Sequence, residues 1–260
     1  MNKDERHAYI LEKLETDQKV LVIDLAKLLD VTPETIRRDL AELEMNEQLS
    51  RIHGGAVPFV PTHKEMVYDK KMSLHIEEKR KIAKRAAELI QDGDTIAVDV
   101  GSTTVHIADM IEYVQGLTVV TNSLSAASRF NLAIEEKRMT GQVIMLPGVT
   151  NPYQASVKGT YTVEFLRRFN FNLAFISCGG VTKEAIYDFD MDESLVSEAM
   201  IQYSQESILL TDSWKLNKKS LFEICPISNI TKVICDTEKP VDWYENGYEW
   251  ITAHAEVHSI

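Results

Sequence analysis

Short apolar, β-branched segments alternate with amphipathic helical segments over most of this 260-residue chain. A helix is expected over 76–90, and the expected strands are 95–100, 117–120, 143–146, 173–177, 207–210 and, as the last one, 233–235. Further helices are expected from the end of the 101–104 loop to about Val114 and over 124–130. This alternation favours a mostly parallel sheet with both faces covered. Residues 76–260 are therefore expected to form an α/β domain.

Small polar residues follow several of these expected strands. They are Gly101, Ser102, Thr103 and Thr104, then Asn122 and Ser123, then Gly179 and Gly180, and finally Asp212 and Ser213. Ligands of parallel α/β sheets bind at the carboxyl ends of the strands. Small residues let backbone N–H groups approach an anion, and the amino end of the helix after the first loop favours negative charge. These loops are therefore expected to gather around an anionic small molecule.

Side chains near these loops have chemistry that suits a phosphorylated ligand. The hydroxyl groups of Ser102, Thr103 and Thr104 can donate hydrogen bonds to a phosphate. Asp99 can accept a hydrogen bond from a sugar hydroxyl, and Lys215 can neutralise a phosphate. The alternative for each loop taken alone is that Gly, Ser and Thr only cap helices and form turns. Neither a Walker phosphate loop nor a G-x-G-x-x-G pattern follows a strand, which gives nucleotide binding little support.

The first 57 residues have a different pattern, in which three helices are expected. Two of them cover about 1–15 and 22–29, and the third covers about 33–44. Thr32 is a favourable N-cap for the third helix, and Pro33 suits its first position, where the missing N–H would have no partner. Two short extended pieces around a glycine turn, within 48–57, are expected to form a wing. This order of elements is typical of a helix-turn-helix unit, whose last helix enters the major groove.

The third helix has an apolar face on one side and Arg38 on the other. Its apolar residues recur at helical spacing, and Arg38 points to the opposite side. The residues expected to contact DNA are Thr35, Arg37 and Arg38 of this helix and Arg51 and His53 of the wing. An arginine can bind a guanine edge through two hydrogen bonds, or it can bind a phosphate. The alternative is a plain three-helix bundle in which Arg37 and Arg38 are ordinary surface residues.

The net charge argues against a general basic surface for nucleic acid. The chain has 28 basic and 40 acidic residues, which give a formal net charge of −12. Residues 1–57 are also acidic, with eight Lys or Arg against twelve Asp or Glu. DNA binding would therefore depend on a local cluster of arginines, with modest non-specific affinity. A helix-turn-helix used only for protein contacts fits the acidic head but leaves Arg37, Arg38 and Arg51 unexplained.

Other features limit the class of protein further. No apolar run is long enough to span a bilayer, and residues 1–14 lack the apolar segment of a signal peptide, so we expect a cytoplasmic protein that does not bind membranes. The three cysteines are far apart, which predicts reduced, mostly buried thiols. His254 and His258 have the spacing of a metal pair but lie in the C-terminal tail, so we expect neither a metal nor a cofactor. Two prolines lie in a charged linker expected over 58–75.

The same motifs resemble a known family. Val31-Thr32-Pro33-Glu34-Thr35-Ile36-Arg37-Arg38-Asp39-Leu40 and Arg51-Ile52-His53-Gly54-Gly55-Ala56 resemble the head of DeoR-type transcriptional regulators. Glu78-Lys79-x-x-Ile82-Ala83, Asp99-x-Gly101-Ser102-Thr103-Thr104, Val120-Thr121-Asn122-Ser123, Cys178-Gly179-Gly180-Val181 and Asp212-Ser213-x-Lys215 resemble the sensor domain of that family. The resemblance covers nearly the whole chain. It implies a sensor fold similar to that of ribose-5-phosphate isomerase and glucosamine-6-phosphate deaminase.

The resemblance implies a transcriptional regulator, and a repressor rather than an activator. Its affinity for double-stranded operator DNA would change when a sugar phosphate or a related phosphorylated metabolite binds. We further expect residues 76–260 to form homo-oligomers, which would bring two heads together on DNA. The alternative is a sugar-phosphate isomerase or deaminase with an appended head, for which Asp99, Asp188, Asp190, Asp192 and His106 are available.

Two departures from the family's usual pattern bear on the ligand. The stretch 183–192 reads Glu184-Ala185-Ile186-Tyr187-Asp188 where the family generally has a Gly-Leu/Val-Thr pattern. Ser197 stands where the family generally has lysine. Both departures can change which effector binds.

Overall fold

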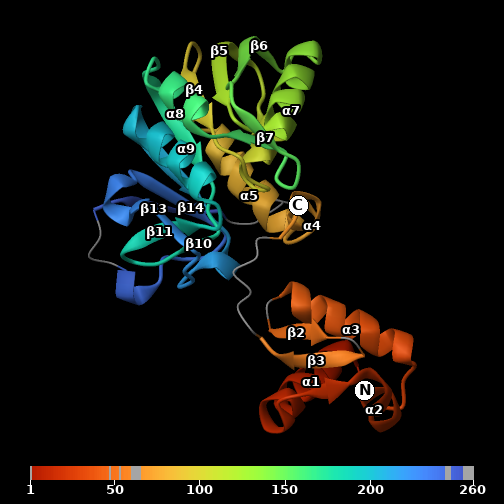
Figure 1. The fold of residues 1–260 in the computed structure, drawn as a ribbon. Coiled ribbons are helices and arrows are strands. Elements are labelled where there is room, and N and C mark those ends of the chain that lie inside the picture. The colour runs from red at the N-terminus through yellow and green to blue at the C-terminus, as the bar shows by residue number, and fades with distance from the viewer. Residues whose placement is uncertain (1, 47, 53, 60–65, 244–246, 254–260) are drawn as a thin grey trace, which may run out of the picture. The chain divides into compact units, whose positions relative to one another are not determined.

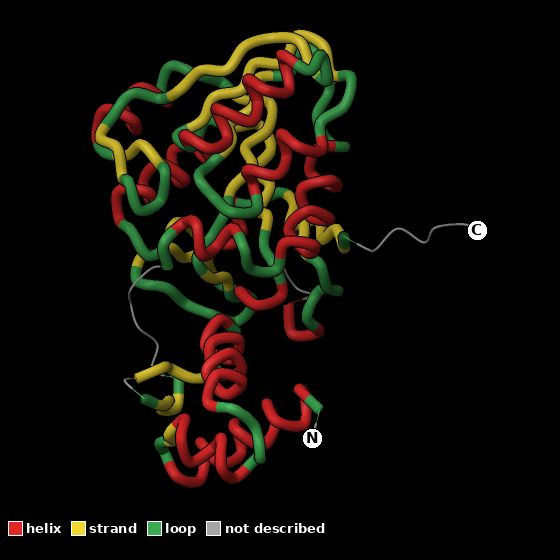
Figure 2. The backbone as a smooth tube through the Cα atoms, turned by 90° about the vertical axis from the view of Figure 1, so that its right-hand side faces the viewer, coloured by secondary structure: helices red, strands yellow, loops and turns green. Residues whose placement is uncertain are grey.

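The protein is described from a computed structural model, in which the described residues are 2–46, 48–52, 54–59, 66–243 and 247–253. The chain divides into two compact units, Met1–Thr62 and His63–Ile260. We call them the head and the body (Figure 1). Figure 2 shows the helices and strands that each of them contains.

The head consists of three helices and a small antiparallel sheet. Its elements are α1 (Lys3–Asp17), β1 (Val20–Leu21), α2 (Val22–Leu28), α3 (Pro33–Met45), β2 (Leu49–Ile52) and β3 (Gly55–Pro58). The strands lie in the order β1-β3-β2. The three expected helices and the two strands of the wing are confirmed, and β1 adds a third strand to the wing.

An apolar cluster and a buried ion pair hold the head together. The cluster contains Ile10, Leu14, Val20, Val22, Leu25, Ala26, Ile36, Leu40, Leu43, Leu49 and Ala56. Asp39 on α3 is 3% exposed, and it accepts hydrogen bonds from Arg6 of α1 at 2.8 and 3.0 Å. Burial alone would raise the pKa of Asp39, but the hydrogen bonds and charge of Arg6 hold it below its usual value. The ion pair therefore fixes α3 against α1.

The body is built on a seven-stranded parallel sheet, which confirms the expected α/β class. Its helices are α4 (Tyr68–Met72), α5 (Ile76–Ala87), α6 (Ile107–Met110), α7 (Leu124–Glu135), α8 (Thr160–Leu166) and α9 (Met191–Gln202), with short 3₁₀ turns η1 (Thr104–His106), η2 (Ser213–Lys215), η3 (Ile227–Asn229) and η4 (Val241–Trp243). Its strands are β4 (Thr95–Val98), β5 (Val114–Thr121), β6 (Met139–Met145), β7 (Val149–Asn151), β8 (Ser156–Lys158), β9 (Phe171–Ile176), β10 (Gly180–Val181), β11 (Ala185–Asp188), β12 (Ser204–Leu210), β13 (Phe222–Pro226), β14 (Lys232–Cys235) and β15 (Glu249–Thr252).

The order of the strands in this sheet, β15-β14-β12-β9-β4-β5-β6, reverses at its centre. From β4 the chain proceeds through β5 to β6 at one edge. It then returns to β9, on the other side of β4, and proceeds to β15 at the opposite edge. The helical segments that follow β4 and β9 pack into different apolar cores, one on each face. The loops after β4 and β9 therefore diverge at the carboxyl edge, which is where open α/β sheets bind ligands.

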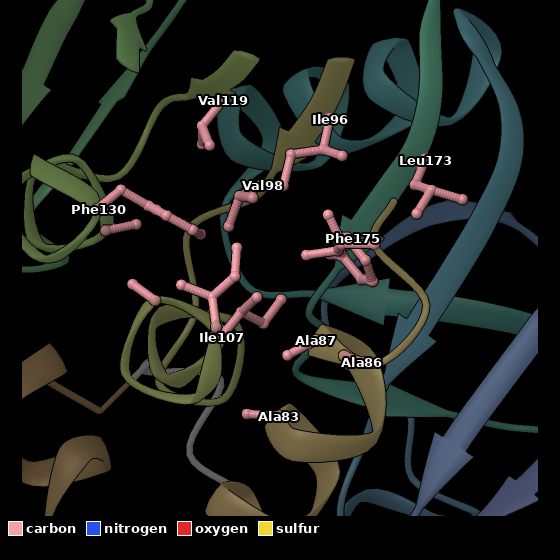
Figure 3. Close-up of a cluster of buried hydrophobic side chains, with 14 of the residues drawn as sticks. Ala83, Ala86, Ala87, Ile96, Val98, Ile107, Val119, Phe130, Leu173 and Phe175 are labelled. Carbon is pink, nitrogen blue, oxygen red and sulfur yellow. The ribbon is translucent and has the colours of Figure 1, made fainter. Parts of the chain in front are cut away.

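Each face of the sheet has its own apolar core. Figure 3 shows the first, which contains Ala83 of α5, Ile107 of α6, Val98 of β4 and Phe175 of β9. The second contains residues of α8, α9 and the small antiparallel sheet β10-β11-β13. Ala97 belongs to the second core and Val98 to the first, as the alternation of a strand requires. The residue that follows β4, Asp99, lies on the side of α9, where the Ser197 hydroxyl donates to its carboxylate.

Two expectations about the elements were wrong. The helix expected to reach about Val114 ends at Met110, because Tyr113 has a left-handed φ of +59° and Val114 already begins β5. The segment 233–235 is not the last strand, because β15 pairs with β14 in parallel. β15 is a short edge strand with an exposed Glu249, so it lacks the apolar run that marks the other strands. The antiparallel sheet β10-β11-β13 and the hairpin β7-β8 were not expected either.

The remaining expectations about the chain concern thiols, membranes and the tail. Cys178, Cys225 and Cys235 are all free and buried, as reduced thiols should be. Within the described part of the chain, no helix has both the length and the apolar character needed to cross a membrane. The two histidines of the tail, His254 and His258, lie outside the described residues.

The ion pair of the head gives a first testable prediction. Asp39→Asn keeps the shape of the side chain but removes the negative charge that Asp39 places beside the Arg6 guanidinium. We expect the free energy of unfolding of the head to fall by about 2 kcal/mol at neutral pH. The folded head holds the pKa of Asp39 below its value in the unfolded chain. The stabilisation by the ion pair is therefore fully present above the unfolded-state pKa and is lost as the pH falls through the folded-state pKa. Hydrogen exchange of the α3 amides in the full chain measures this loss of stability and its dependence on pH.

Asp24→Asn is the matched control, because Asp24 is exposed on α2 of the same head. It should change the exchange of the α3 amides little at any pH. If Asp39→Asn behaved like this control at neutral pH, the ion pair would not be what holds α3 against α1.

Candidate DNA-binding and effector sites

The outer face of α3 carries exposed basic side chains. The Thr32 hydroxyl caps the helix by accepting a hydrogen bond from the Thr35 N–H at 3.2 Å. Arg37 and Arg38 are exposed and Thr35 is half-buried. Arg37 Nη1 lies 3.1 Å from Glu34 Oε2, but an exposed pair of this kind contributes little stability and leaves the arginine available to DNA.

The wing depends on glycine at its turn. Gly54 has a left-handed φ of +79°, and a Cβ on Gly55 would lie 2.0 Å from the Val20 carbonyl oxygen. Arg51 is exposed on β2, and its backbone N–H donates to Glu44 Oε1 on α3 at 3.0 Å. This bond ties the wing to α3. His53, the other expected wing residue, lies outside the described residues.

The second candidate site lies at the carboxyl edge of the body's sheet, where β4 and β9 separate. Asp99 follows β4 and is 1% exposed. Its carboxylate accepts hydrogen bonds from the Val100 N–H at 2.7 Å, the Ser177 N–H at 3.4 Å and the Ser197 hydroxyl at 2.8 Å. Ser177 follows β9 and Ser197 lies on α9, so three elements meet at this carboxylate. Burial raises the pKa of Asp99 to about 8, against the hydrogen bond from Ser197.

The loop after β4 uses some of its hydroxyl groups internally. A Cβ on Gly101 would lie 2.4 Å from the Ser177 Cβ, so only glycine lets this loop approach the end of β9. The Thr104 hydroxyl donates to the Asp99 carbonyl oxygen at 2.8 Å. Ser102 is buried, and the Thr103 hydroxyl is buried with no hydrogen-bond partner among the described residues. The helical segment after this loop is short, so the helix dipole expected there is weak.

Asn122 is the neighbour of Asp99 at the same edge. Val98 pairs with Thr121, so the next residues, Asp99 and Asn122, lie side by side beyond the ends of β4 and β5. Both polar atoms of the Asn122 side chain are buried and have no partner within the described residues. Such groups are rare in folded proteins and indicate a place for water or a ligand. Ser123 instead caps α7, because its hydroxyl accepts from the Ala126 N–H at 3.2 Å.

A buried lysine lies at the same edge. Lys79 of α5 is 3% exposed, and its ammonium donates to the Lys71 carbonyl oxygen at 2.5 Å. Burial lowers the pKa of Lys79 to about 7, and the charge of Lys215 acts in the same direction while Asp212 opposes it. Asp212 follows β12, and its Oδ1 atom is buried with no partner among the described residues. The charges of the buried Lys79 and the half-buried Lys215 together favour an anion near both.

Further carboxyl groups surround Asp99. Glu193 of α9 is 3% exposed and accepts hydrogen bonds from the Ser156 hydroxyl and from Asn151 Nδ2. Burial raises the pKa of Glu193 and also that of Asp188, at the end of β11. The site therefore has an acidic part around Asp99 and Glu193 and a basic part around Lys79.

Gly179 and Gly180 have a structural explanation. The Gly179 N–H donates to the Tyr187 carbonyl oxygen at 2.8 Å, and a Cβ at Gly179 would lie 2.6 Å from the Phe189 ring. A Cβ on Gly180 would lie 2.6 Å from the Lys218 carbonyl oxygen. Both glycines permit close packing next to the site, and their contact with an effector stays a prediction.

We did not expect Lys79 and Glu193 from the sequence as site residues. Each occupies a position on the buried stripe of an otherwise apolar helix face. Lys79 precedes Ile82, Ala83 and Ala86 at spacings of i+3, i+4 and i+7, and Glu193 precedes Val196, Ser197 and Met200 in the same way. A charged residue on such a stripe is the signal that predicts both.

Two family models match this chain. Residues 6–60 match the DeoR-like helix-turn-helix domain, and residues 74–237 match the DeoR C terminal sensor domain. Together these matches include α3, the wing and all the residues named at the effector edge except Lys71.

Characterised and uncharacterised regulators are similar to this chain. An uncharacterized HTH-type transcriptional regulator of Staphylococcus epidermidis is 44% identical over 213 residues, which are 82% of this chain and 84% of that protein. A lactose phosphotransferase system repressor of the same species is 33% identical, covering 91% of this chain and 93% of the relative. The repressor of that name from Staphylococcus aureus is 30% identical and covers 99% of both chains.

Similarity to solved structures is more distant. A D-ribose-5-phosphate isomerase in complex with phospho-erythronic acid has a TM-score of 0.38 and 20% identity, covering 54% of each chain. The eIF2B delta protein of Chaetomium thermophilum has a TM-score of 0.44 and 14% identity, covering 79% of this chain and 65% of that one.

The matched families and named relatives are regulators of transcription rather than enzymes. This chain belongs to the DeoR family of DNA-binding transcriptional regulators, with a helix-turn-helix domain followed by a sensor domain.

Proposed function

We propose that this protein is a cytoplasmic repressor whose residues 1–57 bind double-stranded operator DNA and whose residues 76–260 bind a sugar phosphate. Residues 58–75 act as the linker between them. Relatives that carry the name repressor support repression. The observation that carries the effector part is the buried Lys79 beside Lys215 at an edge where polar side chains lack partners.

The phosphate of the effector binds at the basic part of the edge. Lys79 and Lys215 supply charge, and the open Thr103 hydroxyl supplies a hydrogen-bond donor. Asn122 and Asp99 lie beside each other and bind the polar groups of the sugar. A phosphate near Lys79 offsets both its burial and its repulsion by Lys215, which is why an anion favours this place.

Lys79 also provides a route by which effector binding changes the start of the body. Its ammonium donates to the carbonyl oxygen of Lys71, in α4. α4 lies near the end of the 58–75 segment. The Tyr68 N–H donates to the Tyr153 carbonyl oxygen, and Gln154 Nε2 donates to the Met66 carbonyl oxygen, both at the turn of the β7-β8 hairpin. An effector that draws the Lys79 ammonium to its phosphate releases the bond to α4. The protein would then bind the effector more tightly without the Lys79–Lys71 hydrogen bond than with it. Such a difference is what a ligand needs in order to change operator affinity.

The body brings two heads together by forming homo-oligomers. A second head bound to the same DNA gains affinity through its high effective concentration. This matters for a head whose residues 1–57 are acidic overall, because one head alone gains little from general electrostatic attraction.

The proposal is tested by binding of the purified protein to DNA from upstream of its own gene neighbourhood. Fluorescence anisotropy is recorded with and without a panel of sugar phosphates. We expect specific binding that one compound alters. Specific binding that no compound alters would contradict the effector part, and turnover of a sugar phosphate without specific binding would favour the isomerase or deaminase.

The face of α3 gives a prediction about sequence recognition. Arg38→Ala should weaken operator binding by roughly 1–3 kcal/mol and relax the sequence preference, because a guanine edge loses its two hydrogen bonds. Arg37→Ala should weaken binding to all sequences alike and reduce the salt dependence by about one charge, as loss of a phosphate contact does. Anisotropy titrations on operator and scrambled DNA at several salt concentrations measure both.

Arg167→Ala is the control, because Arg167 is exposed at the C-cap of α8 in the body and pairs with Glu164 as Arg37 pairs with Glu34. It should leave binding to both DNAs unchanged. Operator affinity that survives Arg38→Ala would show that α3 does not read the DNA through this side chain.

Lys79 gives a prediction about pH. A neighbouring phosphate favours the ammonium form, so the pKa of Lys79 is higher in the complex than the value of about 7 in the free protein. Effector affinity must then rise as the pH falls from alkaline values toward neutrality. Lys79→Met should weaken effector binding about tenfold at neutral pH and remove most of this dependence. Isothermal titration calorimetry over a pH series measures both effects.

Lys84→Met is the control, since Lys84 is exposed on the same helix. It should retain both the affinity and the pH dependence of the unmodified protein. Equal effector affinity of Lys79→Met and Lys84→Met would place the phosphate elsewhere.

A further inference from the structure

α9 has large apolar side chains on its exposed side. Its buried residues include the polar Glu193, Ser194 and Ser197, whereas Met191 and Leu195 are 57% and 41% exposed. These two residues are four apart in the helix, so they lie on the same side of it. A surface helix normally keeps its apolar residues on the inner side, and a helix with apolar residues on all sides is normally buried. The outer side of α9 therefore has the character of a covered surface.

Exposed apolar side chains of two neighbouring elements lie close to the start of α9. Lys158 of β8 forms an ion pair with Asp190, which caps α9 directly before Met191. Val149 of β7 pairs with Lys158 in the β7-β8 hairpin, so their side chains lie on the same face. Tyr161 lies in the first turn of α8, three residues after Lys158. Val149 and Tyr161 are 66% and 75% exposed, and both therefore lie around the same ion pair as Met191.

These residues belong to elements that contact one another. α8 packs against α9, and the β7-β8 hairpin bonds to the first turn of α9 through Asn151 and Glu193 (Figure 1). Single exposed apolar residues are common, but a group of them on adjoining elements indicates contact with another molecule. The name α9 surface is used below for this group, which consists of Val149, Tyr161, Met191 and Leu195 around the Lys158–Asp190 ion pair.

The charges of the α9 surface suit a second copy of the same chain. Lys158 and Asp190 place one positive and one negative group at its centre, where their side chains are still partly exposed. A two-fold axis beside this pair brings Lys158 of each copy close to Asp190 of the other. Neither charge is then buried without a partner. Asp192 and Glu198, which are exposed on the same helix, belong to the polar rim of such an interface.

A second copy is also what the head needs for tight binding to DNA. Residues 1–57 are acidic overall, so one head alone gains little from electrostatic attraction. Two bodies that contact each other present two heads to one DNA. The inner side of α9 reaches the effector site, where the Ser197 hydroxyl donates to Asp99. A copy bound to the outer side would therefore contact the same helix that borders the effector.

We infer that the α9 surface is the interface through which two copies of this chain associate. The four apolar side chains of each copy become buried, and the ion pairs of the two copies lie next to each other about a two-fold axis. This inference rests on the proposed homo-oligomer, and it states where the copies meet.

Sedimentation velocity of the full chain over a range of concentrations tests the inference. Met191→Glu and Tyr161→Glu each add a charge to the α9 surface. Both residues are exposed and lie in the first turn of a helix, where a carboxylate is favourable, so the fold tolerates either change. A two-fold interface contains each substitution twice. We expect each variant to weaken association by at least about a hundredfold, because two charges lose water without a new partner.

Leu132→Glu is the matched control, because Leu132 is exposed on α7, outside the α9 surface. It should associate as tightly as the unmodified chain, and all three variants should keep its far-UV circular dichroism. Hydrogen exchange of the unmodified chain is a second measurement, which needs no substitution. Dilution below the association range should speed exchange in the first turns of α8 and α9 and leave exchange in α7 unchanged.

The outcomes separate this inference from the proposed function. An unmodified chain that stays monomeric at micromolar concentrations contradicts the proposed homo-oligomer, and the inference fails with it. Association of Met191→Glu that is as tight as that of Leu132→Glu overturns the inference alone, because the copies would then meet elsewhere. Association that Leu132→Glu also abolishes overturns it as well, because the interface would then include α7.

Discussion

The site for the effector depends on one topological constraint, the reversal of strand order between β4 and β9. Because the chain leaves these neighbouring strands toward opposite edges, the loops that follow them part at the carboxyl edge. The helical segments after the two strands cover opposite faces of the sheet. Residues from β4, β5, β9, β12 and α9 can then reach one place, and Asp99 bonds to groups from two of these neighbours.

Charges buried at this edge are costly unless something compensates them. Lys79 is nearly fully buried on α5, and Glu193 is nearly fully buried on α9. An all-apolar stripe at both positions would pack more favourably, so their presence indicates a function other than stability.

The head is constrained by its small number of basic residues. Its net charge is negative, so the positions of its arginines matter more for binding DNA than their number. Arg6 pairs with the buried Asp39 and so orients α3, whereas Arg37 and Arg38 are exposed. The glycines of the wing let β3 approach β1 closely, and the bond from Arg51 to Glu44 holds the wing against α3. Rigid placement of a few basic side chains favours selective over general binding.

The sequence by itself determined the α/β class, the helices of the head, the cap at Thr32 and the exposed arginines, because each follows from local periodicity or local bonding. It did not determine which distant side chains meet. Ser197 bonds to Asp99 across 98 residues, and Lys79 meets Lys215 only through the packing of α5 beside η2. The edge strand β15 and the early end of α6 were missed, since pairing with β14 and the backbone angle at Tyr113 decide them. The order of the strands in the sheet decides which of these side chains come together. A local sequence pattern carries no information about that order.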